Sequence, residues 1–388
     1  MPNNDQIYEA LQHHLDSSPV GFPATPSGAH LTVLKHFFTP QEARIAASLS
    51  TMKLETAAVI HRRLKRNDFK ISLDTLREKL DDMARRGTIL VYNEGFKERH
   101  YKNAGVTAGG IFDFQVNRLS KELVDTFHQY HEEIFARAEM TGSRSIPQLR
   151  TIPVARSIPT PEQRRVSTYD DVRRILEDSP GPFAVANCIC RQTKDISGEP
   201  CAYSDIRETC LQIGTDHARQ YVEMGIARYV SKDEAFEILD KACEAGFILQ
   251  PENSLKPEAI CCCCGDCCGI LSAVLKSPRP ADMFASNYYA AVDASLCQAC
   301  GKCVQRCQLK ARNLSPSPLT GEGRGEGEET LVSTVDLNRC IGCGNCVITC
   351  PSNATRLVLK EKPLVPPKDK NATYLKILSD KLGFWKSR

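Results

Sequence analysis

The feature that most constrains this chain is the distribution of its cysteines. The chain has 388 residues and 19 cysteines, and every cysteine lies between Cys188 and Cys350. Such density is typical of small secreted disulfide scaffolds, but this chain is long enough for two or three cores and its cysteine count is odd. The N-terminus shows no apolar signal-peptide core. We therefore expect a cytoplasmic protein in a reducing compartment whose cysteines hold metal.

Hydropathy and charge exclude two further classes. No stretch approaches 18 uninterrupted apolar residues, so the sequence predicts no membrane span. The formal net charge of +3 is too close to neutral to indicate a polyanionic partner for the whole chain.

Two copies of one cysteine motif lie near the C-terminal end. The copies are Cys297-x2-Cys300-x2-Cys303-x3-Cys307 and Cys340-x2-Cys343-x2-Cys346-x3-Cys350-Pro351. Three cysteines spaced by two residues can wrap one corner of a cubane, and the glycines inside the loops supply the backbone freedom this needs. Zinc sites more often use CxxC pairs separated by a longer loop. The doubled motif therefore favours iron–sulfur clusters over zinc.

This doubled motif resembles the bacterial two-cluster ferredoxins, which bind two [4Fe–4S] clusters. The resemblance implies a crosswise set of ligands: Cys297, Cys300, Cys303 and Cys350 for cluster I, and Cys340, Cys343, Cys346 and Cys307 for cluster II. The sequence departs from the pattern at Gln308, where proline would follow the fourth cysteine. It also carries a low-complexity insertion at 315–329, whose glycine spacing does not fit a nucleotide-binding loop.

A second group of ten cysteines lies upstream of the doubled motif. Its members are Cys188, Cys190, Cys201, Cys210, Cys261, Cys262, Cys263, Cys264, Cys267 and Cys268. Residues 184–186 read as a strand, and a period of two would place Cys188 and Cys190 on one face. Neighbouring side chains diverge, so the four consecutive cysteines feed two sites or leave some thiols free. We expect at least one additional [4Fe–4S] cluster here, with zinc or a redox-active thiol set as alternatives.

Three other residues of this region carry predictions. Cys243 falls on the apolar face of a helix over 231–247, capped by Ser231, and is expected to be a buried core thiol. Arg191 and Asp266 lie beside or within the cysteine motifs. Both are expected to be structural partners rather than catalytic groups.

The cysteine-free residues 31–140 carry helix and hairpin signals. Thr39 and Glu42 form a capping box with proline at the first helical position. Helical stretches follow at 55–66 and after Ser72, and then a hairpin over 88–101. Three helices followed by a two-stranded ribbon resemble a winged helix-turn-helix domain, which implies DNA reading by the helix over 73–86. That helix has four basic and four acidic residues, so protein contact or dimerisation is favoured over DNA.

The sequence thus predicts an α+β multidomain chain. The expected parts are an arm (1–30), a winged-helix-like domain (31–140), a Pro-rich connector with a short helix (141–180), a Cys-rich, mostly helical middle domain (181–280), a dicluster ferredoxin domain (285–362) and a tail (363–388). A further amphipathic helix near 119–134 either docks on the second part or pairs with another copy of the chain, as a homodimer would.

The arrangement resembles multi-cluster ferredoxin-like proteins of anaerobic microbes. The resemblance implies iron–sulfur binding and redox partner proteins. We expect an electron carrier, or the electron-transfer subunit of an oxidoreductase, rather than a stand-alone enzyme. The alternatives are a redox-responsive DNA-binding regulator and an iron–sulfur enzyme that uses the region between Cys188 and Cys268.

Overall fold

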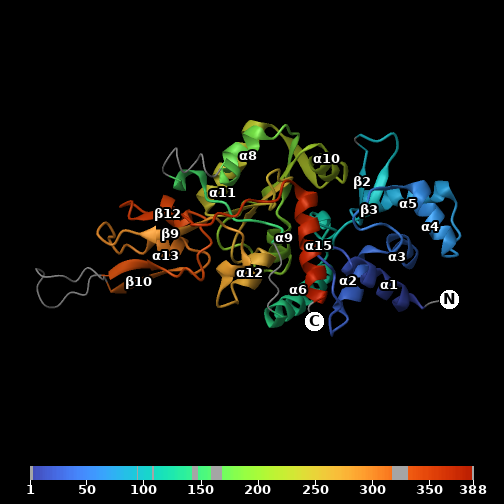
Figure 1. Ribbon diagram of the computed structural model, residues 1–388, viewed down its shortest axis with the longest axis horizontal. Helices are drawn as coiled ribbons and strands as arrows, with labels where there is room; N and C mark the ends of the chain where they lie inside the picture. Colours follow the sequence, from blue (N-terminus) through green and yellow to red (C-terminus); the bar gives the residue numbers. More distant parts are fainter. Residues whose placement is uncertain are drawn as a thin grey trace, which may run out of the picture.

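The N-terminal helices and the C-terminal cysteine motifs lie at opposite ends of an elongated molecule, with a sheet between them (Figure 1). The computed structural model describes residues 3–93, 95–106, 109–141, 147–158, 168–316 and 331–386. No described helix is long and apolar enough to cross a membrane.

The N-terminal part consists of helices and a small antiparallel sheet of strand order β1-β3-β2. Its elements are α1 (Asn4–Asp16), α2 (Ala29–Phe37), α3 (Pro40–Ala46), β1 (Glu55–Thr56), α4 (Ala57–Arg66), α5 (Leu73–Arg85), β2 (Ile89–Tyr92), β3 (His100–Asn103), the 3-10 turn η1 (Asp113–Gln115) and α6 (Lys121–Thr141). The predicted capping box is present, since the Thr39 side chain accepts from the Glu42 N–H and the Glu42 carboxylate accepts from the Thr39 N–H.

The amphipathic helix expected near 119–134 is α6, and its apolar face packs on its own chain. The rings of Phe112 and Phe127 stack with centroids 3.5 Å apart, and the ring centroids of Tyr130 and Phe22 lie 4.6 Å apart. Phe22 is fully buried, so the residues expected to form an arm belong to the same core.

The middle of the chain is built on a five-stranded antiparallel sheet of order β6-β4-β5-β8-β7. Its strands are β4 (Phe183–Asn187), β5 (Glu208–Ile213), β6 (Ala227–Val230), β7 (Ile248–Pro251) and β8 (Ala259–Cys263). The helices are α8 (Val172–Asp178), α9 (Ile189–Ile196), α10 (Thr215–Glu223), α11 (Lys232–Ala245) and α12 (Gly269–Val274). Apolar residues of α8 and α11 share a core with one face of the sheet. Residues of β4 and α10 join the core of the N-terminal part.

Two predictions for this region are wrong. The middle domain is not mostly helical, because its helices surround a sheet. The strand predicted at residues 184–186 is confirmed as part of β4, whose residues 183–186 are all buried. The period-two pattern does not continue through Cys188 and Cys190. The strand ends at Asn187, Cys188 caps α9, and Cys190 lies inside that helix.

The C-terminal motifs lie in two similar halves. The first half contains β9 (Tyr288–Val292), α13 (Lys302–Arg306) and β10 (Arg312–Pro316), and the second contains β11 (Leu331–Val335), α14 (Asn345–Ile348) and β12 (Thr355–Leu359). Each element follows its counterpart by 43 residues, which is also the spacing of the motifs (340 minus 297). Strand β9 pairs with β12 and β10 with β11, so each half completes the sheet of the other. Beyond residue 316, the predicted insertion at 315–329 lies outside the described residues.

Two segments join the parts of the molecule. Residues 147–158, within the expected connector, include the 3-10 turn η2 (Ala155–Ser157) and run between β7 and the cysteine loops. The Val154 N–H donates to the Cys343 carbonyl at 3.0 Å. The turns η3 (Thr168–Asp170) and η4 (Pro280–Met283) flank the middle part. Helix α15 (Lys370–Lys386) lies against the N-terminal part, where Lys381 Nζ donates to the Ser18 carbonyl at 3.1 Å.

Candidate metal centres

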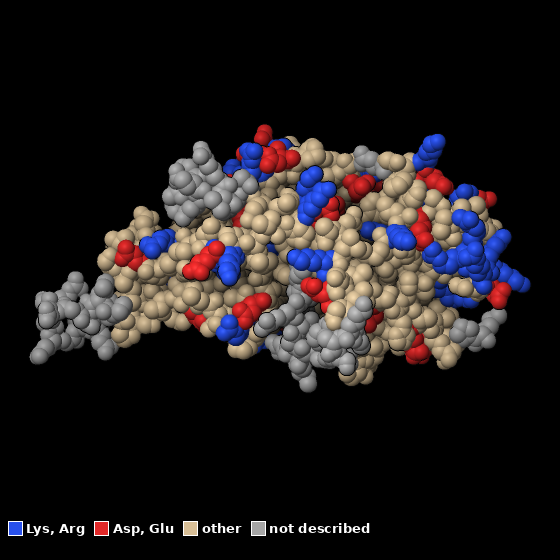
Figure 2. Space-filling model, in the orientation of Figure 1, with Lys and Arg blue, Asp and Glu red and all other residues tan. Residues whose placement is uncertain are grey.

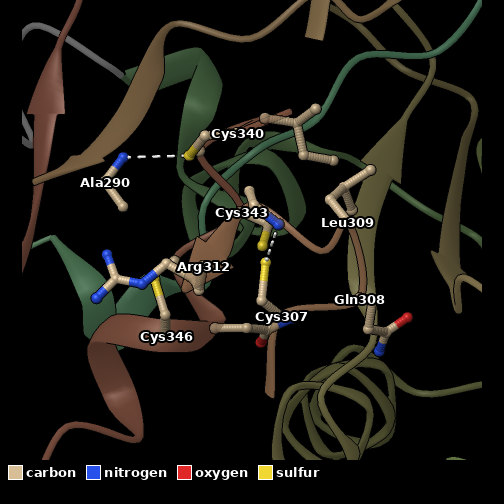
Figure 3. A pocket seen from close by; sticks show the side chains of 13 residues that line it. Ala290, Cys307, Gln308, Leu309, Arg312, Cys340, Cys343 and Cys346 are labelled. Atoms are coloured by element: carbon tan, nitrogen blue, oxygen red, sulfur yellow. Dashed lines mark hydrogen bonds between the residues drawn. The ribbon is translucent and has the colours of Figure 1, made fainter. Parts of the chain in front are cut away.

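Two cavities near the C-terminal end are each lined by four cysteines. Cavity I is lined by Cys297, Cys300, Cys303 and Cys350. Cavity II is lined by Cys307, Cys340, Cys343 and Cys346 (Figure 3). Each cavity takes three cysteines from one motif and the fourth from the other. The structure therefore brings together the same two quartets that the ferredoxin resemblance groups as ligands.

Several sulfurs of these quartets accept hydrogen bonds. Backbone N–H groups donate at 3.3 Å to three of them: Ala290 to Cys340, Ala311 to Cys307, and Ser333 to Cys297. A sulfur that accepts N–H groups is stabilised as a thiolate, the form that binds metal. Four convergent thiols with donors aimed at their sulfurs fit a cluster held by four cysteines.

Residues 295–355 match the family model of the 4Fe-4S dicluster domain. No curated protein and no solved structure matches the chain. The family match and the two cysteine quartets support [4Fe–4S] binding and an iron–sulfur electron-transfer role for this chain.

The loops of the dicluster domain need left-handed backbone at equivalent positions. Gly301 has a φ of 73° and its counterpart Gly344 a φ of 81°. A side chain at Gly301 would meet nothing within 4 Å, whereas a Cβ on Gly344 would lie 2.1 Å from Ser157 Oγ. The second loop is therefore in close contact with the segment that precedes the middle domain, and only glycine fits there.

Burial favours the protonated form of two thiols of cavity II. It raises the pKa of Cys346 to about 12, and it raises the pKa of Cys343 well above the ordinary range. Metal binding would therefore release protons here, because a ligating cysteine is a thiolate.

Arg312 is a functional candidate that the sequence reasoning missed. Its side chain is almost fully buried, and it lines cavity II. Its Nη2 donates to Cys303 Sγ of cavity I at 3.4 Å and to the hydroxyls of Ser333 and Thr355. No ion pair joins it to an acidic residue among the described parts of the chain, and its Nε and Nη1 have no hydrogen-bond partner. A buried cation without an acidic partner is the signal for an anionic group beside it.

In the middle domain, β8 divides the run of cysteines between two faces of the sheet. Cys262 and Cys264 lie in the core beneath α8 and α11. Cys261 and Cys263 lie in a different apolar cluster that also contains residues of the dicluster domain. This follows from the alternation of side chains along a strand.

Six thiols form one contact group, which we call the interdomain thiol set. It comprises Cys188, Cys190, Cys210, Cys261, Cys263 and Cys268. The thiol hydrogen bonds run from Cys188 to Cys190, Cys268, Cys263, Cys261 and Cys210 in turn. Cys210 and Cys261 face each other as paired residues of β5 and β8.

Three further cysteines and one carboxylate form a separate group, which we call the thiol–carboxylate site. Its members are Cys201, Cys264, Asp266 and Cys267, whose ligand atoms all lie within 4.8 Å of one another. Cys262 and Cys243 belong to neither group. Cys243 lies on the buried face of α11, which confirms the prediction of a core thiol. Burial raises its pKa to about 11.

Arg191 is fully buried between these groups. It donates to the Thr209 hydroxyl and to the Cys262 carbonyl, each at 2.6 Å, and its guanidinium carbon lies 3.7 Å from the centroid of the Phe247 ring. Both hydrogen-bond partners are neutral. Its charge therefore faces the surrounding thiols, which is the structural role expected for it.

The departure at Gln308 connects the dicluster domain to the middle domain. Gln308 is buried, its Nε2 donates to the Gly246 carbonyl at 2.6 Å, and its Oε1 accepts from the Gly265 N–H at 2.6 Å. Asn345 also donates to the Gly246 carbonyl, at 2.7 Å. These bonds hold the C-terminal end of α11 and the cysteine run against cavity II.

Proposed function

We propose that this chain is an electron-transfer protein, or the electron-transfer subunit of an anaerobic cytoplasmic oxidoreductase system. It relays single electrons through two [4Fe–4S] clusters, held by the quartets of cavities I and II, and through a further cluster on the interdomain thiol set. The observation that carries the proposal is the pair of cavities, each lined by four cysteines. A cluster held by four thiolates supplies one-electron transfer.

The placement of the thiols supports a path across the molecule. Cys300 of cavity I is exposed, which provides an edge for a redox partner protein. Cys307, Cys340 and Cys343 of cavity II pack in the same apolar cluster as Cys263 and Cys268 of the interdomain thiol set. Apolar packing excludes water between neighbouring sites and holds their separation constant.

The spacing of the interdomain thiol set supports a cluster rather than a single ion. Neighbouring thiols of this set are in contact in pairs, yet no three of them lie within 4.8 Å of one another. Among the described residues, the thiol–carboxylate site alone has three or more ligand atoms that close together. Thiolates on one ion crowd together, whereas a cubane holds each thiolate on a different iron atom. Six thiols exceed the four that a cubane needs.

The metal content of the anaerobically purified full chain tests the number of clusters. Three cubanes would give about twelve irons per chain and two would give about eight. A value near eight in protein with intact cavities would remove the further cluster and leave the relay in the dicluster domain.

Four single variants test the crosswise assignment. Cys297→Ser and Cys350→Ser remove ligands from one cavity, although they belong to different motifs, and they should abolish the same electron paramagnetic resonance signal. Cys340→Ser and Cys307→Ser should both abolish the other signal. If the signals were lost motif by motif instead, the assignment would be wrong.

A second candidate function, a redox-responsive DNA-binding regulator, has one observation in its favour. The order α3, β1, α4, α5, β2 and β3 is similar to a winged helix, and Figure 2 shows Lys and Arg side chains gathered where Figure 1 places α4 and α5. The exposed members at α4 and just beyond it are Arg62, Lys65, Arg66 and Lys70.

The helix expected to read DNA counts against this second function. In α5, Arg77 pairs with Asp74 at 3.0 Å and Arg85 pairs with Asp82, and Arg86 at the end of the helix pairs with both Asp82 and Glu42. These cations are paired with acidic side chains, so they offer less charge to phosphates. Mobility shifts of labelled DNA with the oxidised and the reduced protein decide the matter, and a shift in neither state removes this function.

A further inference from the structure

We infer that the thiol–carboxylate site binds one tetrahedral zinc ion, separate from any iron–sulfur cluster. The site consists of Cys201, Cys264, Cys267 and Asp266. It goes beyond the electron-transfer function and does not depend on it.

The distances match one ion. Sulfur ligands at about 2.3 Å around a tetrahedral zinc ion stand about 3.8 Å apart. Cys201 Sγ lies 3.7 Å from Cys264 Sγ and 3.8 Å from Asp266 Oδ1.

A comparison within the molecule separates this site from the cluster sites. In the part of the chain that the structure describes, no other group of three or more His, Cys, Asp or Glu ligand atoms lies within 4.8 Å of one another. The quartets of cavities I and II are therefore more widely spaced than the thiol–carboxylate site. That difference is the one expected between four ligands on four iron atoms and four ligands on one ion.

The local structure presents the ligands from two sides. Cys264 and Cys267 have the CxxC spacing of zinc-binding turns, and they lie between the end of β8 and the start of α12. Cys201 comes from the loop between α9 and β5. One ion would therefore fasten this loop to the cysteine run.

Hydrogen bonds outside the ligand set orient two of the ligands. The Ala202 N–H donates to Asp266 Oδ2 at 2.7 Å, which leaves Oδ1 directed at Cys201. The Cys201 sulfur accepts from the backbone N–H groups of Tyr203 and Ser204. Partners of this kind fix ligand direction in metal sites.

Burial and charge suit a closed, structural site. Cys264 and Cys267 are buried, whereas Cys201 and Asp266 are partly exposed, so an ion can enter from solvent. Three thiolates and a carboxylate carry four negative charges, and the buried Arg191 guanidinium stacks on Phe247, which shares a core with Cys262 and Cys264. With four protein ligands, no coordination position is left for substrate.

Metal analysis of the full chain tests the site. After anaerobic purification and dialysis against EDTA, the wild type should retain about one zinc per chain beside its iron. Cys201→Ala should lose this zinc and keep its iron. Cys243→Ala removes a buried thiol outside the site and should change neither metal. Absence of zinc from the wild type, or loss of iron instead of zinc from Cys201→Ala, would overturn the inference.

A second measurement uses the wild type alone and so does not depend on the folding of a variant. Zinc K-edge absorption should report three sulfur ligands at about 2.3 Å and one oxygen ligand at about 2.0–2.2 Å. A shell of four sulfurs, or one of oxygen and nitrogen only, would contradict the assignment.

Discussion

The buried guanidinium of Arg312 leads to a quantitative prediction for the dicluster domain. Its positive charge lines cavity II and reaches the Cys303 sulfur of cavity I at 3.4 Å. A positive charge next to a cluster favours the state with one more electron. Replacing Arg312 with methionine, which keeps much of the buried volume, should therefore lower the reduction potentials of the clusters.

The magnitude follows from Coulomb's law. The iron atoms would lie one bond beyond the Cys303 sulfur, so we take about 7 Å from the guanidinium to the cluster and an effective dielectric constant of about 20, which gives about 2.4 kcal/mol. For a one-electron couple this corresponds to about 100 mV. The expected shift is downward for both clusters, because the side chain contacts residues of both cavities.

Potentiometric titration followed by electron paramagnetic resonance measures the shift. Arg356→Met is a matched control, since Arg356 lies in β12 of the same domain but is exposed. Solvent and salt screen an exposed charge, so its removal should shift the potentials by less than about 20 mV. Iron content should be the same in both variants and the wild type.

The reasoning would be refuted if the Arg312 variant kept its iron and its potentials lay within about 20 mV of the control. An upward shift would also contradict it. A loss of iron alone would assign Arg312 to cluster retention, which Arg312→Lys separates from the charge effect because lysine keeps the charge.

Three further predictions concern the loops around the cavities and a buried histidine of α6. Gln308→Pro restores the ferredoxin pattern but leaves the buried Gly265 N–H without its acceptor. Denaturant unfolding should therefore show a free energy of unfolding lower by about 1–3 kcal/mol. An unchanged free energy would mean that the interdomain contact is dispensable. Gly301→Ala should cost about 1 kcal/mol of unfolding free energy for left-handed backbone. Gly344→Ala should cost roughly 1–3 kcal/mol more for the steric overlap, and equal costs would contradict the close contact. Burial lowers the pKa of His131 from 6.5 to about 4, so between pH 6.5 and 4 the unfolded chain binds more protons and the folded state loses stability as the pH falls. In His131→Gln, the melting temperature should fall less steeply with falling pH. An unchanged slope would exclude this histidine as the cause.

The cysteine quartets could be predicted because their information is local. Three of the four ligands in each quartet lie within seven consecutive residues, for example Cys297 to Cys303, so chain connectivity alone keeps them together. The start of α3 and the burial of Cys243 were predictable for a similar reason, since capping and apolar periodicity depend on residues three or four apart.

The middle domain could not be predicted in the same way. Its strands are short and buried, and β8 reads in sequence as a run of cysteines with no alternation of polar and apolar residues. Which thiols face which side depends on the pairing of β8 with β5 and β7, whose residues lie up to 51 positions away. The separation of a six-thiol set from a thiol–carboxylate site thus needs the sheet.

The uneven distribution of 19 cysteines and the spacing of two motifs were enough to predict a metal-binding protein with a dicluster domain, because a cubane needs closely spaced thiolates and those lie close along the chain. Only the tertiary structure decided how the other cysteines divide, and that Arg312, Arg191 and Gln308 lie buried among them. Such contacts join residues remote in sequence. A single sequence contains no record of them, because burial of a charge or an amide is a property of the packed chain.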